Sequence, residues 1–556
     1  KSTTTTTTTT TTTRTYMSAS LSFSPLKKTL VVASRGRRHH HRMLSSICVR
    51  RPRANAVGDD GRESRPRRRG RSSEGGRGGG RGRRSTKSSE EDYKITLRNI
   101  RKSSKRFDTD EQVSEMYGRS AELKKAMESG MPSVKLASGK ANIFMDGNPL
   151  VYGGAIDSTE NNPENGQAVG VFDHNFRPVG WGAYNSSSMF RVRMLELAKE
   201  TESPILIKRV VKKRIQEAQM LREKVLDTKK GGKTNAYRLI NSEGDRLSGM
   251  IIDKYGNDNH FVVSSSAGWV EMHKRDIIDA LREVMMSEGD GKNDEDMTIV
   301  WRRDTGMYDL EGVDVTEKVS VYDKNGDDAS ASLQGEIEIM ENGVKYLVNL
   351  VDGHKTGFYV DQRDNRSFVG ELSKINNGKS DFSVLDCCTY TGGFAINAAV
   401  AGCKNVTAVD SSKIVLSIAA RNAELNNVHD SINFVPSDVF DYLDDCISNN
   451  RQYDVLVVDP PKFAPTVKSL SKALLKYIGL NARAMRCVKP GGILISCSCS
   501  GAVTQRKLLP NIVFEASQAA NRRIVKVKDG GAGVDQPIDP TFPEGEYLSV
   551  VAVRVM

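Results

Sequence analysis

The sequence predicts an α/β protein that ends in a doubly wound parallel sheet, preceded by a small β-barrel and an α+β unit. Short β-type runs broken by Gly and Asn-Pro predict the barrel at residues 131–203. A charged helix followed by mixed strands predicts the α+β unit at 204–345. Strict alternation of apolar runs with helical stretches predicts the parallel sheet at 346–556. The chain of 556 residues is long enough for each part to bury its own core.

The N-terminal extension, residues 1–130, is expected to be disordered and carries the excess positive charge. Residues 1–89 contain 22 Lys plus Arg and four Asp plus Glu, so the net charge of +13 leaves the rest of the chain at −5. After a threonine-rich run, residues 17–58 are rich in Ser and Arg and contain no acidic residue. This composition predicts an organellar transit peptide, for the chloroplast more than for the mitochondrion; the alternative is a basic tail without targeting. The Arg/Gly-rich residues 61–87 could equally bind RNA phosphates or form a solvated linker.

The composition supports neither a membrane protein nor a metal-binding protein. No apolar run approaches the ~20 residues that cross a bilayer, so no membrane role is expected. The eight cysteines form no CxxC pair, which is typical of a reduced compartment. Only Cys497 and Cys499 are spaced like metal ligands, and because a zinc site needs about four ligands, no metal is expected.

Local patterns predict the elements of the first two folded parts. A polar helical stretch at 93–129 precedes the barrel, and a helix rich in Lys, Arg and Glu spans 204–227. In the α+β unit we expect one further helix at 270–286. The expected strands lie at 237–243, 247–256, 260–266, 297–303 and 336–351.

The C-terminal part repeats one unit, an apolar run followed by a helix. Such repetition predicts parallel strands joined by right-handed crossovers. The last run, 547–555, has no helix after it and is expected to close the edge of the sheet antiparallel. The five repeated runs lie at 383–390, 405–412, 432–439, 453–461 and 491–500.

Polar residues mark the carboxyl ends of these strands, where ligands bind in an open parallel sheet. They are Asp386, Asp410, Asp438, Asp459 and Cys499. The small, Gly-containing turn after Asp386 lets the backbone pass close to a cofactor, and Asp410, 24 residues later, can accept both ribose hydroxyls of an adenosyl group. Because no GxGxxG pattern is present, an adenosyl cofactor is favoured over a dinucleotide.

Asp459 opens a second motif, Asp459-Pro460-Pro461-Lys462-Phe463, at the end of the fourth strand. Two prolines stiffen the backbone there, so that carbonyls freed from the sheet can face a planar base. A rigid turn without further function is the alternative. A related motif serves the methylation of exocyclic amines, which are already nucleophiles and need no covalent step.

Cys499 in the run Ser-Cys-Ser-Gly favours different chemistry. Carbon C5 of cytosine is a poor nucleophile, and a thiolate added at C6 raises the electron density at C5. Cys499 ends the fifth strand beside the expected crevice. The alternatives are that Cys499 is a buried apolar residue, or that Cys497, two residues earlier on the same face, is the nucleophile or a spare thiol.

From about residue 134 to the end, the chain resembles the bacterial large-subunit ribosomal RNA cytosine-C5 methyltransferases of the RlmI type. The resemblance rests on HKTGFYVDQRDNR at 354–366, CTYTGGFAINA at 388–398, VVDPPKF at 457–463 and GGILISCSCSG at 491–501. It implies a PUA-like RNA-binding domain, an α+β middle domain and a Rossmann-like class I domain that uses S-adenosylmethionine. The basic N-terminal extension departs from the bacterial pattern, as does the thiol of Cys497 where the family has a larger apolar residue.

The resemblance also implies a role for each matching residue. Cys499 would be the nucleophile. Many related enzymes have a second cysteine after the Asp-Pro pair, but this chain has Lys462 in that region, so Asp459 is our candidate for the base that removes the C5 proton. A lid strand against cofactor and target would contain Lys355, Thr356, Gly357, Tyr359, Asp361, Gln362 and Arg363. Cofactor contacts would further come from Asp386, Tyr390, Gly392, Gly393, Phe394, Asp410, Ser411, Asp438, Val439 and Asp459, and target contacts from Lys355, Pro460, Pro461, Lys462 and Phe463.

The function that follows is formation of 5-methylcytosine in large-subunit ribosomal RNA. The expected partner is ribosomal RNA, and the oligomeric state is left open between monomer and homodimer. Two alternatives stay open: a methyltransferase that acts on another RNA or on an amine, and a non-catalytic ribosome-assembly factor that kept the fold.

Overall fold

The structure, a computed structural model, describes residues 129–200, 206–228, 232–257, 259–286, 297–330, 333, 335–376, 378–464 and 469–556. The chain divides into two units, 1–90 and 91–556, and the described residues all belong to the second. The predicted transit peptide, the Arg/Gly-rich segment and nearly all of the helical stretch at 93–129 therefore lie outside the described residues. No helix in the described ranges combines the length and the apolar character needed to span a membrane.

The segment predicted as a small barrel forms a six-stranded sheet. Its strand order is β2-β6-β5-β4-β1-β3, with β1 parallel to β4 and the other neighbours antiparallel. Val134, Val151, Val171 and Val192 pack in its core with the short helix α3 (Asn142–Met145). The strands are β1 (Ser133–Leu136), β2 (Leu150–Tyr152), β3 (Ile156–Glu160), β4 (Ala168–Phe172), β5 (Pro178–Tyr184) and β6 (Phe190–Leu197).

A five-stranded sheet of order β11-β10-β9-β8-β7 forms the middle part. Helix α4 (Ile207–Val225) packs against α6 (Lys274–Met285), and the apolar residues of both join the strands in one core. The edge strand β11 (Val319–Asp323) was not predicted from the sequence. The other elements are β7 (Tyr237–Asn241), β8 (Met250–Tyr255), β9 (His260–Ser265), α5 (Gly268–Met272), β10 (Thr298–Arg303) and α7 (Thr305–Glu311).

The prediction of a single helix at 270–286 is wrong in one respect. The structure has two helices in this range, α5 and α6, which are separated at His273. The backbone of His273 has φ −105° and ψ 22°, outside the helical region. Its imidazole nitrogens lie 2.9 Å from the carboxylate of Asp276 and 2.8 Å from the carbonyl oxygen of Gly166. Side-chain bonds that compete with helix geometry explain why periodicity alone missed the break.

The C-terminal sheet has seven strands in the order β16-β15-β14-β17-β18-β20-β19. The first five strands along this order are parallel, as predicted from the alternation of strands and helices. The strands are β14 (Ser383–Cys387), β15 (Asn405–Asp410), β16 (Ile432–Pro436), β17 (Tyr453–Val458), β18 (Val488–Ser498), β19 (Ile524–Gly530) and β20 (Ser549–Val555). The helices are α8 (Arg363–Ile375), α9 (Gly393–Val400), α10 (Lys413–Leu425), α11 (Val439–Ser448), α12 (Leu470–Arg486), α13 (Gly501–Thr504) and α14 (Leu509–Ala519).

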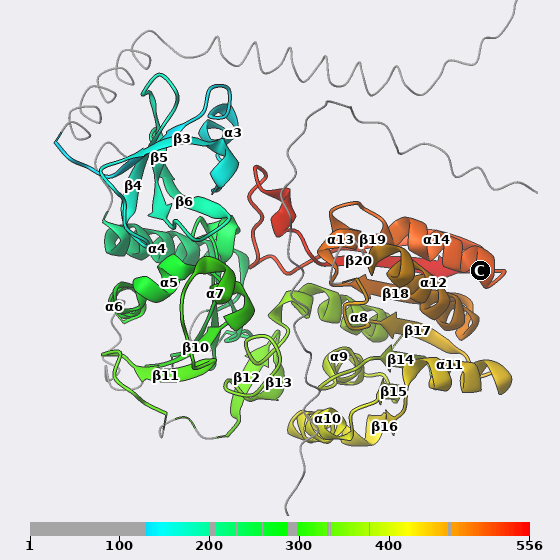
Figure 1. Cartoon of the computed structure of the whole chain (residues 1–556). Helices are drawn as coiled ribbons and strands as arrows, with labels where there is room; N and C mark the ends of the chain where they lie inside the picture. Colours follow the sequence, from blue (N-terminus) through cyan, green and yellow to red (C-terminus); the bar gives the residue numbers. More distant parts are fainter. Residues whose placement is uncertain are drawn as a thin grey trace, which may run out of the picture. The chain divides into compact units, whose positions relative to one another are not determined.

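Strand β20 is antiparallel, as expected, but it does not form the edge of the sheet. It pairs with β18 on one side and with β19 on the other, so that β19 is the edge (Figure 1). Strand β19 went unpredicted because Val525 and Val527 are about half exposed, and no buried apolar face marks it as a strand.

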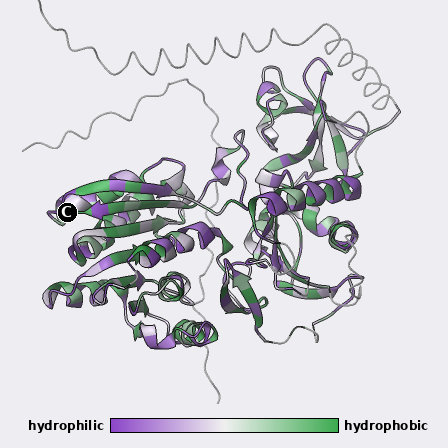
Figure 2. Cartoon of the chain, turned by 180° about the vertical axis from the view of Figure 1, so that it is seen from behind, coloured by the Kyte–Doolittle hydropathy of each residue, from purple (hydrophilic) through white to green (hydrophobic). Residues whose placement is uncertain are grey.

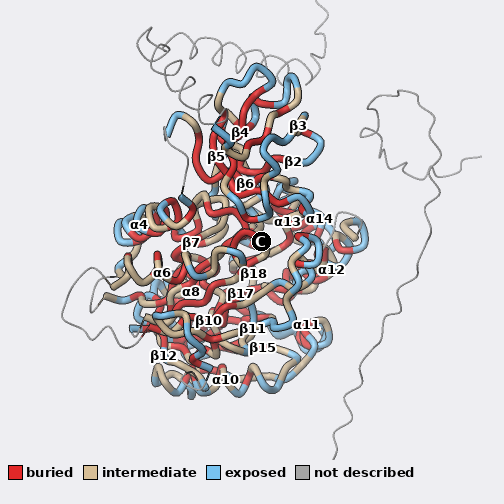
Figure 3. Tube along the Cα trace, turned by 60° about the vertical axis from the view of Figure 1, so that its left-hand side comes forward, coloured by how far each residue is buried: buried red, intermediate tan, exposed pale blue. Residues whose placement is uncertain are grey.

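Helices cover both faces of this sheet. On one face, α11, α12 and α14 pack over Leu385, Leu456 and Leu494. On the other, α8 and α9 pack over Val384 and Val457, together with the hairpin of β12 (Ile337–Glu341) and β13 (Val344–Val348). The predicted domain boundary after residue 345 thus falls inside this hairpin. The strands are hydrophobic and buried, whereas α10 and α11 expose their outer faces (Figures 2 and 3).

The reversal of strand order places a crevice between β14 and β17. The chain leaves β14 toward β15 on one side, and β17 continues toward β18 on the other. Loops at the carboxyl ends of these two strands diverge, which is where open parallel sheets bind ligands. Asp386 and Asp459 lie at those two ends.

Candidate active site

A cavity of about 590 Å³ lies at the carboxyl ends of these strands. Its volume is in the range of small-molecule sites. The structure brings together in it most of the side chains predicted from the sequence. The predicted residues that line it are Lys355, Tyr359, Asp361, Gln362, Tyr390, Gly393, Phe394, Asp410, Ser411, Asp438, Val439, Asp459, Pro460, Pro461, Phe463 and Cys499.

Six of the residues predicted for the site do not line the cavity: Thr356, Gly357, Arg363, Asp386, Gly392 and Lys462. The guanidinium of Arg363 is buried against the carboxylate of Asp535, with N–O distances of 2.7 and 2.9 Å. Lys462 is exposed, one residue beyond the proline pair. Arg363 as a cofactor contact and Lys462 as a target contact therefore have no support in the geometry.

The predicted lid strand at 355–363 is also wrong. Residues 351–359 form turns, 360–362 a 3-10 helix, and Arg363 begins α8. Two glycines explain the difference, because a Cβ on Gly353 would lie 2.3 Å from the carbonyl oxygen of Asn349, and Gly357 has φ +122°. Lys355 adopts φ +52°, a left-handed conformation incompatible with a strand.

Asp386 positions the turn after β14 through hydrogen bonds to two of its residues. Its Oδ2 atom accepts hydrogen bonds from the Thr389 hydroxyl at 2.5 Å and from the Ala395 amide at 3.0 Å, which holds both ends of the turn. Burial raises the pKa of Asp386 to about 7. The backbone takes left-handed φ values at Cys388, just before the first anchor, and at Tyr390 and Gly392 between the two. The turn is therefore a preformed concave surface at the start of α9.

Two carboxylates fix the part of the cavity that fits an adenosyl group. Asp410 ends β15 and accepts hydrogen bonds from the amides of Tyr390 (3.1 Å) and Ser412 (3.0 Å), which orient its carboxylate at the strand end. Asp438 caps α11 by accepting from the Phe440 amide at 2.8 Å. A carboxylate suits vicinal ribose hydroxyls, and an aromatic ring beside a helix cap suits a purine. These donor and acceptor types fit S-adenosylmethionine.

Cys499 and Asp459 lie at neighbouring strand ends and line the same cavity. Val457 and Cys497 pack in the same hydrophobic core, on one face of the sheet. Because side chains alternate between the two faces along a strand, Asp459 and Cys499, each two residues later, are directed to that same face. Burial raises the pKa of the Cys499 thiol, and the negative charge of Asp459 raises it further. Burial also raises the pKa of Asp459, to about 6, with the charge of Asp361 adding to the effect. Cys497 is fully buried and does not line the cavity.

An ion pair between Lys355 and Asp361 forms one wall of the cavity. Asp361 also accepts a hydrogen bond from the Tyr547 hydroxyl at 2.7 Å. Burial opposes ionisation of Asp361, but Lys355 and this bond keep its pKa below the usual range. Its second oxygen, Oδ1, is buried without a hydrogen-bond partner in the described structure. A ligand with a donor group would satisfy it.

Several lining residues were not assigned from the sequence. The ring of His354 stacks on Tyr390, with centroids 5.2 Å apart and planes at 20°, and Tyr359 meets Tyr390 edge-on at 5.2 Å. Phe440 and Cys388 also line the cavity. His354 is the first residue of the stretch 354–366 on which the family resemblance rests, so the sequence could have predicted that it lies in the site.

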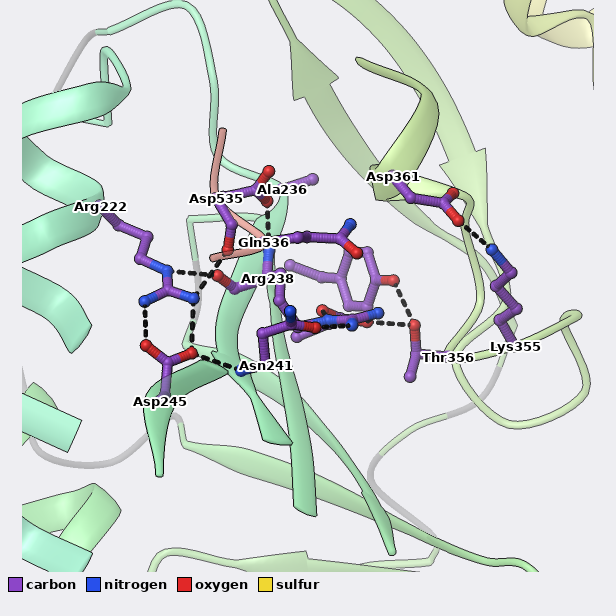
Figure 4. Close-up of polar contacts among 12 residues, drawn as sticks. Arg222, Ala236, Arg238, Asn241, Asp245, Lys355, Thr356, Asp361, Asp535 and Gln536 are labelled. Atoms are coloured by element: carbon purple, nitrogen blue, oxygen red, sulfur yellow. Dashed lines mark hydrogen bonds and ion pairs between the residues drawn. The ribbon is translucent and has the colours of Figure 1, made fainter. Parts of the chain in front are cut away.

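A clamp from the middle sheet holds the turn that carries Lys355. Arg302 on β10 donates hydrogen bonds to the carbonyl oxygens of Val351 and Gly353, each at 2.7 Å, and to that of Lys355. The Thr356 hydroxyl donates to Asp253 at 2.5 Å (Figure 4). Three carbonyls bound by one guanidinium fix the turn in a conformation that Lys355 alone does not favour.

We expect Arg302→Ala to lower the turnover number by about 10- to 100-fold, because displacing a positioned group by about 1 Å can cost that much. Steady-state kinetics would measure the loss, and millimolar guanidinium ion should restore part of the activity. Arg303→Ala is the matched control, since Arg303 lies on the same strand but binds Glu271 instead. Equal losses in both variants, without rescue, would show that the clamp has no specific role.

Comparison with known proteins agrees with this geometry. A family described as S-adenosylmethionine-dependent methyltransferase matches residues 319–528, and a PUA-like domain family matches 134–197. Ribosomal RNA large subunit methyltransferase I of Vibrio vulnificus strain YJ016 is 34% identical over 432 residues, covering 76% of this chain and 99% of that protein. The protein of the same name from Klebsiella pneumoniae strain 342 is 32% identical and covers 77% of this chain and 100% of its own.

Solved structures support the same fold. A Streptococcus mutans protein described as a SAM-dependent methyltransferase has a TM-score of 0.59 at 20% identity, over 76% of this chain and 100% of that one. A second solved structure, with a TM-score of 0.58, is described as a complex with SAH. The predicted fold class and cofactor, S-adenosylmethionine, are confirmed. The chain therefore belongs to the ribosomal RNA large subunit methyltransferase I family, with a PUA-like domain ahead of a Rossmann-like, S-adenosylmethionine-dependent methyltransferase domain.

Proposed function

We propose that the protein methylates C5 of a cytosine in large-subunit ribosomal RNA through a covalent bond to Cys499. The observation that carries this proposal is that a thiol and a carboxylate from neighbouring strand ends, Cys499 and Asp459, line the cavity that also contains the adenosyl-type acceptors Asp410 and Asp438. The relatives named above supply the class of substrate. The PUA-like domain is a module suited to structured RNA.

In the proposed reaction, Cys499 forms and breaks the bond to the base, and Asp459 carries the proton that leaves C5. The Cys499 thiol loses its proton to solvent, and the thiolate bonds to C6 of the cytosine, which moves an electron pair onto C5. Bound S-adenosylmethionine supplies the methyl group that C5 takes up. Asp459 then accepts the C5 proton, the C5–H electron pair restores the ring double bond, and the C6–S bond breaks to return the thiolate. Asp459 finally releases its proton to solvent.

The ring contacts of the cavity suit a cytosine that has left its helix. Pro460, Pro461 and Phe463 line one side, and the Phe463 ring lies 4.9 Å from the ring of Tyr477 beneath it. The Nε2 atom of Gln362 donates to Asp459 at 2.9 Å, which orients the proposed base. An unstacked base is the state in which an RNA-modifying enzyme can reach a ring carbon.

The ionisation of Asp459 predicts a pH dependence. The Cys499 thiol must also lose its proton, and because its pKa is raised, the turnover number should already fall about tenfold per pH unit above pH 6. Below pH 6 the protonation of Asp459 adds to this loss, so we expect the fall to steepen to about 100-fold per pH unit. Asp459→Asn should remove the additional steepening, leave the dependence that comes from Cys499, and lower activity at pH 8 by about 100-fold. Asp386→Asn is the control at saturating cofactor, because Asp386 does not line the cavity although its pKa is raised to about 7. A turnover number that still falls more steeply below pH 6 than above it in Asp459→Asn would rule out Asp459 as the source of the steepening.

The product itself tests the proposed function. Purified protein, large-subunit ribosomal RNA and labelled S-adenosylmethionine should yield 5-methylcytidine when the RNA is digested and its nucleosides are separated by chromatography and mass spectrometry. N4-methylcytidine would instead indicate amine methylation, the chemistry of the related Pro-Pro-aromatic motif. Cofactor binding without any RNA product would favour an assembly factor.

Import into an organelle, the chloroplast before the mitochondrion, is a proposal that rests on the composition of residues 17–58 alone. A fluorescent protein fused behind residues 1–130 should enter the organelle. The same fusion lacking residues 17–58 should stay outside it, and identical distributions would contradict import.

A further inference from the structure

A second cavity, of about 370 Å³, adjoins the active site. Its walls come from three segments: residues 238–251 with Ser264 of the middle sheet, the turn residues Lys355 and Thr356, and residues 537–547. Lys355 lines both cavities, so they adjoin at this residue. Figure 4 shows Lys355 joined to Asp361, and Thr356 between Lys355 and Asn241.

Its lining combines apolar side chains with hydrogen-bond acceptors. The apolar and aromatic residues of the segment 537–547 that line it are Pro537, Ile538, Phe542 and Tyr547. Ile538 remains 38% exposed and Phe542 is only partly buried, so neither side chain is fully packed in the hydrophobic core. Aromatic rings in the lining suit a planar ring that can stack on them.

The charges in this cavity exclude a phosphate as its occupant. The two cations among its lining residues are both committed, Arg238 to Asp253 at 2.5 Å and Lys355 to Asp361. Two carboxylates, Glu243 and Asp539, also line it. A carboxylate accepts hydrogen bonds and repels anions, so the cavity favours a neutral group that presents N–H donors.

We propose that this cavity binds a nucleobase of the same RNA, adjacent to the target cytosine, and that it selects a base with an amino group on its hydrogen-bonding edge. The inference rests on the proposed RNA substrate, and it extends recognition beyond the methylated nucleotide. Enzymes that act on an unstacked base choose their substrates partly through contacts with its flanking nucleotides. The base stacks on Phe542, and its amino group donates to Glu243.

An RNA containing abasic nucleotides tests the proposal. Once the methylated position is mapped, synthetic RNAs of that site would each carry one abasic nucleotide within three positions on either side. For the wild-type protein we expect one abasic position to lower kcat/KM by about 10-fold or more, mainly through KM, since stacking on an aromatic ring is worth about 1–3 kcal/mol per base. Phe542→Ala should show a similar loss with intact RNA.

The decisive result is the combination of both changes. For the Phe542→Ala variant, the abasic RNA should cause no further loss of kcat/KM, because the aromatic ring on which the base stacks is already absent. Phe514→Ala is the matched control: this phenylalanine on α14 is 52% exposed, lines neither cavity and should retain wild-type kinetics with both RNAs. Losses that multiply in the combination, or a Phe542→Ala variant that keeps wild-type kcat/KM, would overturn the proposal.

A second variant tests the choice of base without removing bulk. Glu243→Gln should reduce the preference, measured as the ratio of the kcat/KM values, for an amino-bearing base over uracil at the sensitive position. An undiminished preference would contradict recognition by Glu243. These readouts are differences between RNAs, so they separate this site from the chemistry: a product other than 5-methylcytidine would overturn the proposed reaction and leave the test of the second cavity intact.

Discussion

Cys499→Ala is expected to lower the rate of methyl transfer by on the order of 10³-fold or more, the largest effect of any single substitution that we predict. Without a thiol at C6, C5 of cytosine keeps its low electron density, and no other thiol takes the place of Cys499. Cys499→Ser should be nearly as inactive, because an alcohol ionises far less readily than a thiol. Single-turnover assays with labelled methyl donor would measure both variants.

Two other cysteines provide controls for this result. Cys497 is fully buried two residues earlier on the same strand, and Cys388 lines the cavity in the turn after β14. Burial raises the pKa of both thiols strongly, which disfavours either as a thiolate. Cys497→Ala and Cys388→Ala should retain at least about one tenth of the wild-type rate, if they fold. A Cys499→Ala variant as active as these two would remove the covalent step from the mechanism.

Asp535→Ala is expected to destabilise the protein by about 3–5 kcal/mol, the typical cost of removing one partner from a buried ion pair. Asp535 is fully buried and binds Arg363 through both carboxylate oxygens, at 2.7 and 2.9 Å. It also accepts from the Arg238 amide at 2.7 Å, and its carbonyl oxygen accepts from Arg222 at 2.7 Å (Figure 4). The carboxylate of Asp535 therefore joins α8 to β7, and its backbone carbonyl oxygen adds a contact to α4.

Denaturant unfolding would measure the change in the free energy of unfolding. Asp529→Ala is the matched control, because the exposed pair of Asp529 with Lys526 on the edge strand should contribute less than about 1 kcal/mol. If Asp535→Ala were no more destabilised than Asp529→Ala, the buried cluster would not stabilise the junction of the middle part with the methyltransferase domain.

The strand ends of the active site could be predicted because two periodicities determine them. Alternating strands and helices place every parallel strand end on one edge of the sheet, so Asp410, Asp438, Asp459 and Cys499 had to converge. Each follows directly on an apolar run that the sequence marks clearly. The roles of these residues stay predictions until activity is measured.

Contacts between distant segments could not be predicted in this way. Arg302 reaches the turn of Lys355 from a strand more than 45 positions earlier, and nothing in its own strand distinguishes it from Arg303. Arg363 matched the family stretch, yet its partner Asp535 lies 172 residues away, and that buried pair turns it from the cavity. Such side-chain directions depend on tertiary packing, which local patterns do not contain.

Trapping the covalent bond tests the central claim most directly. Large-subunit ribosomal RNA containing 5-azacytidine at the target position should form a stable adduct with the wild-type protein, and peptide mass spectrometry should locate the nucleotide on Cys499. No adduct is expected with Cys499→Ala, and an undiminished one with Cys497→Ala. An adduct on another residue, or none under conditions where the normal RNA is methylated, would contradict the mechanism.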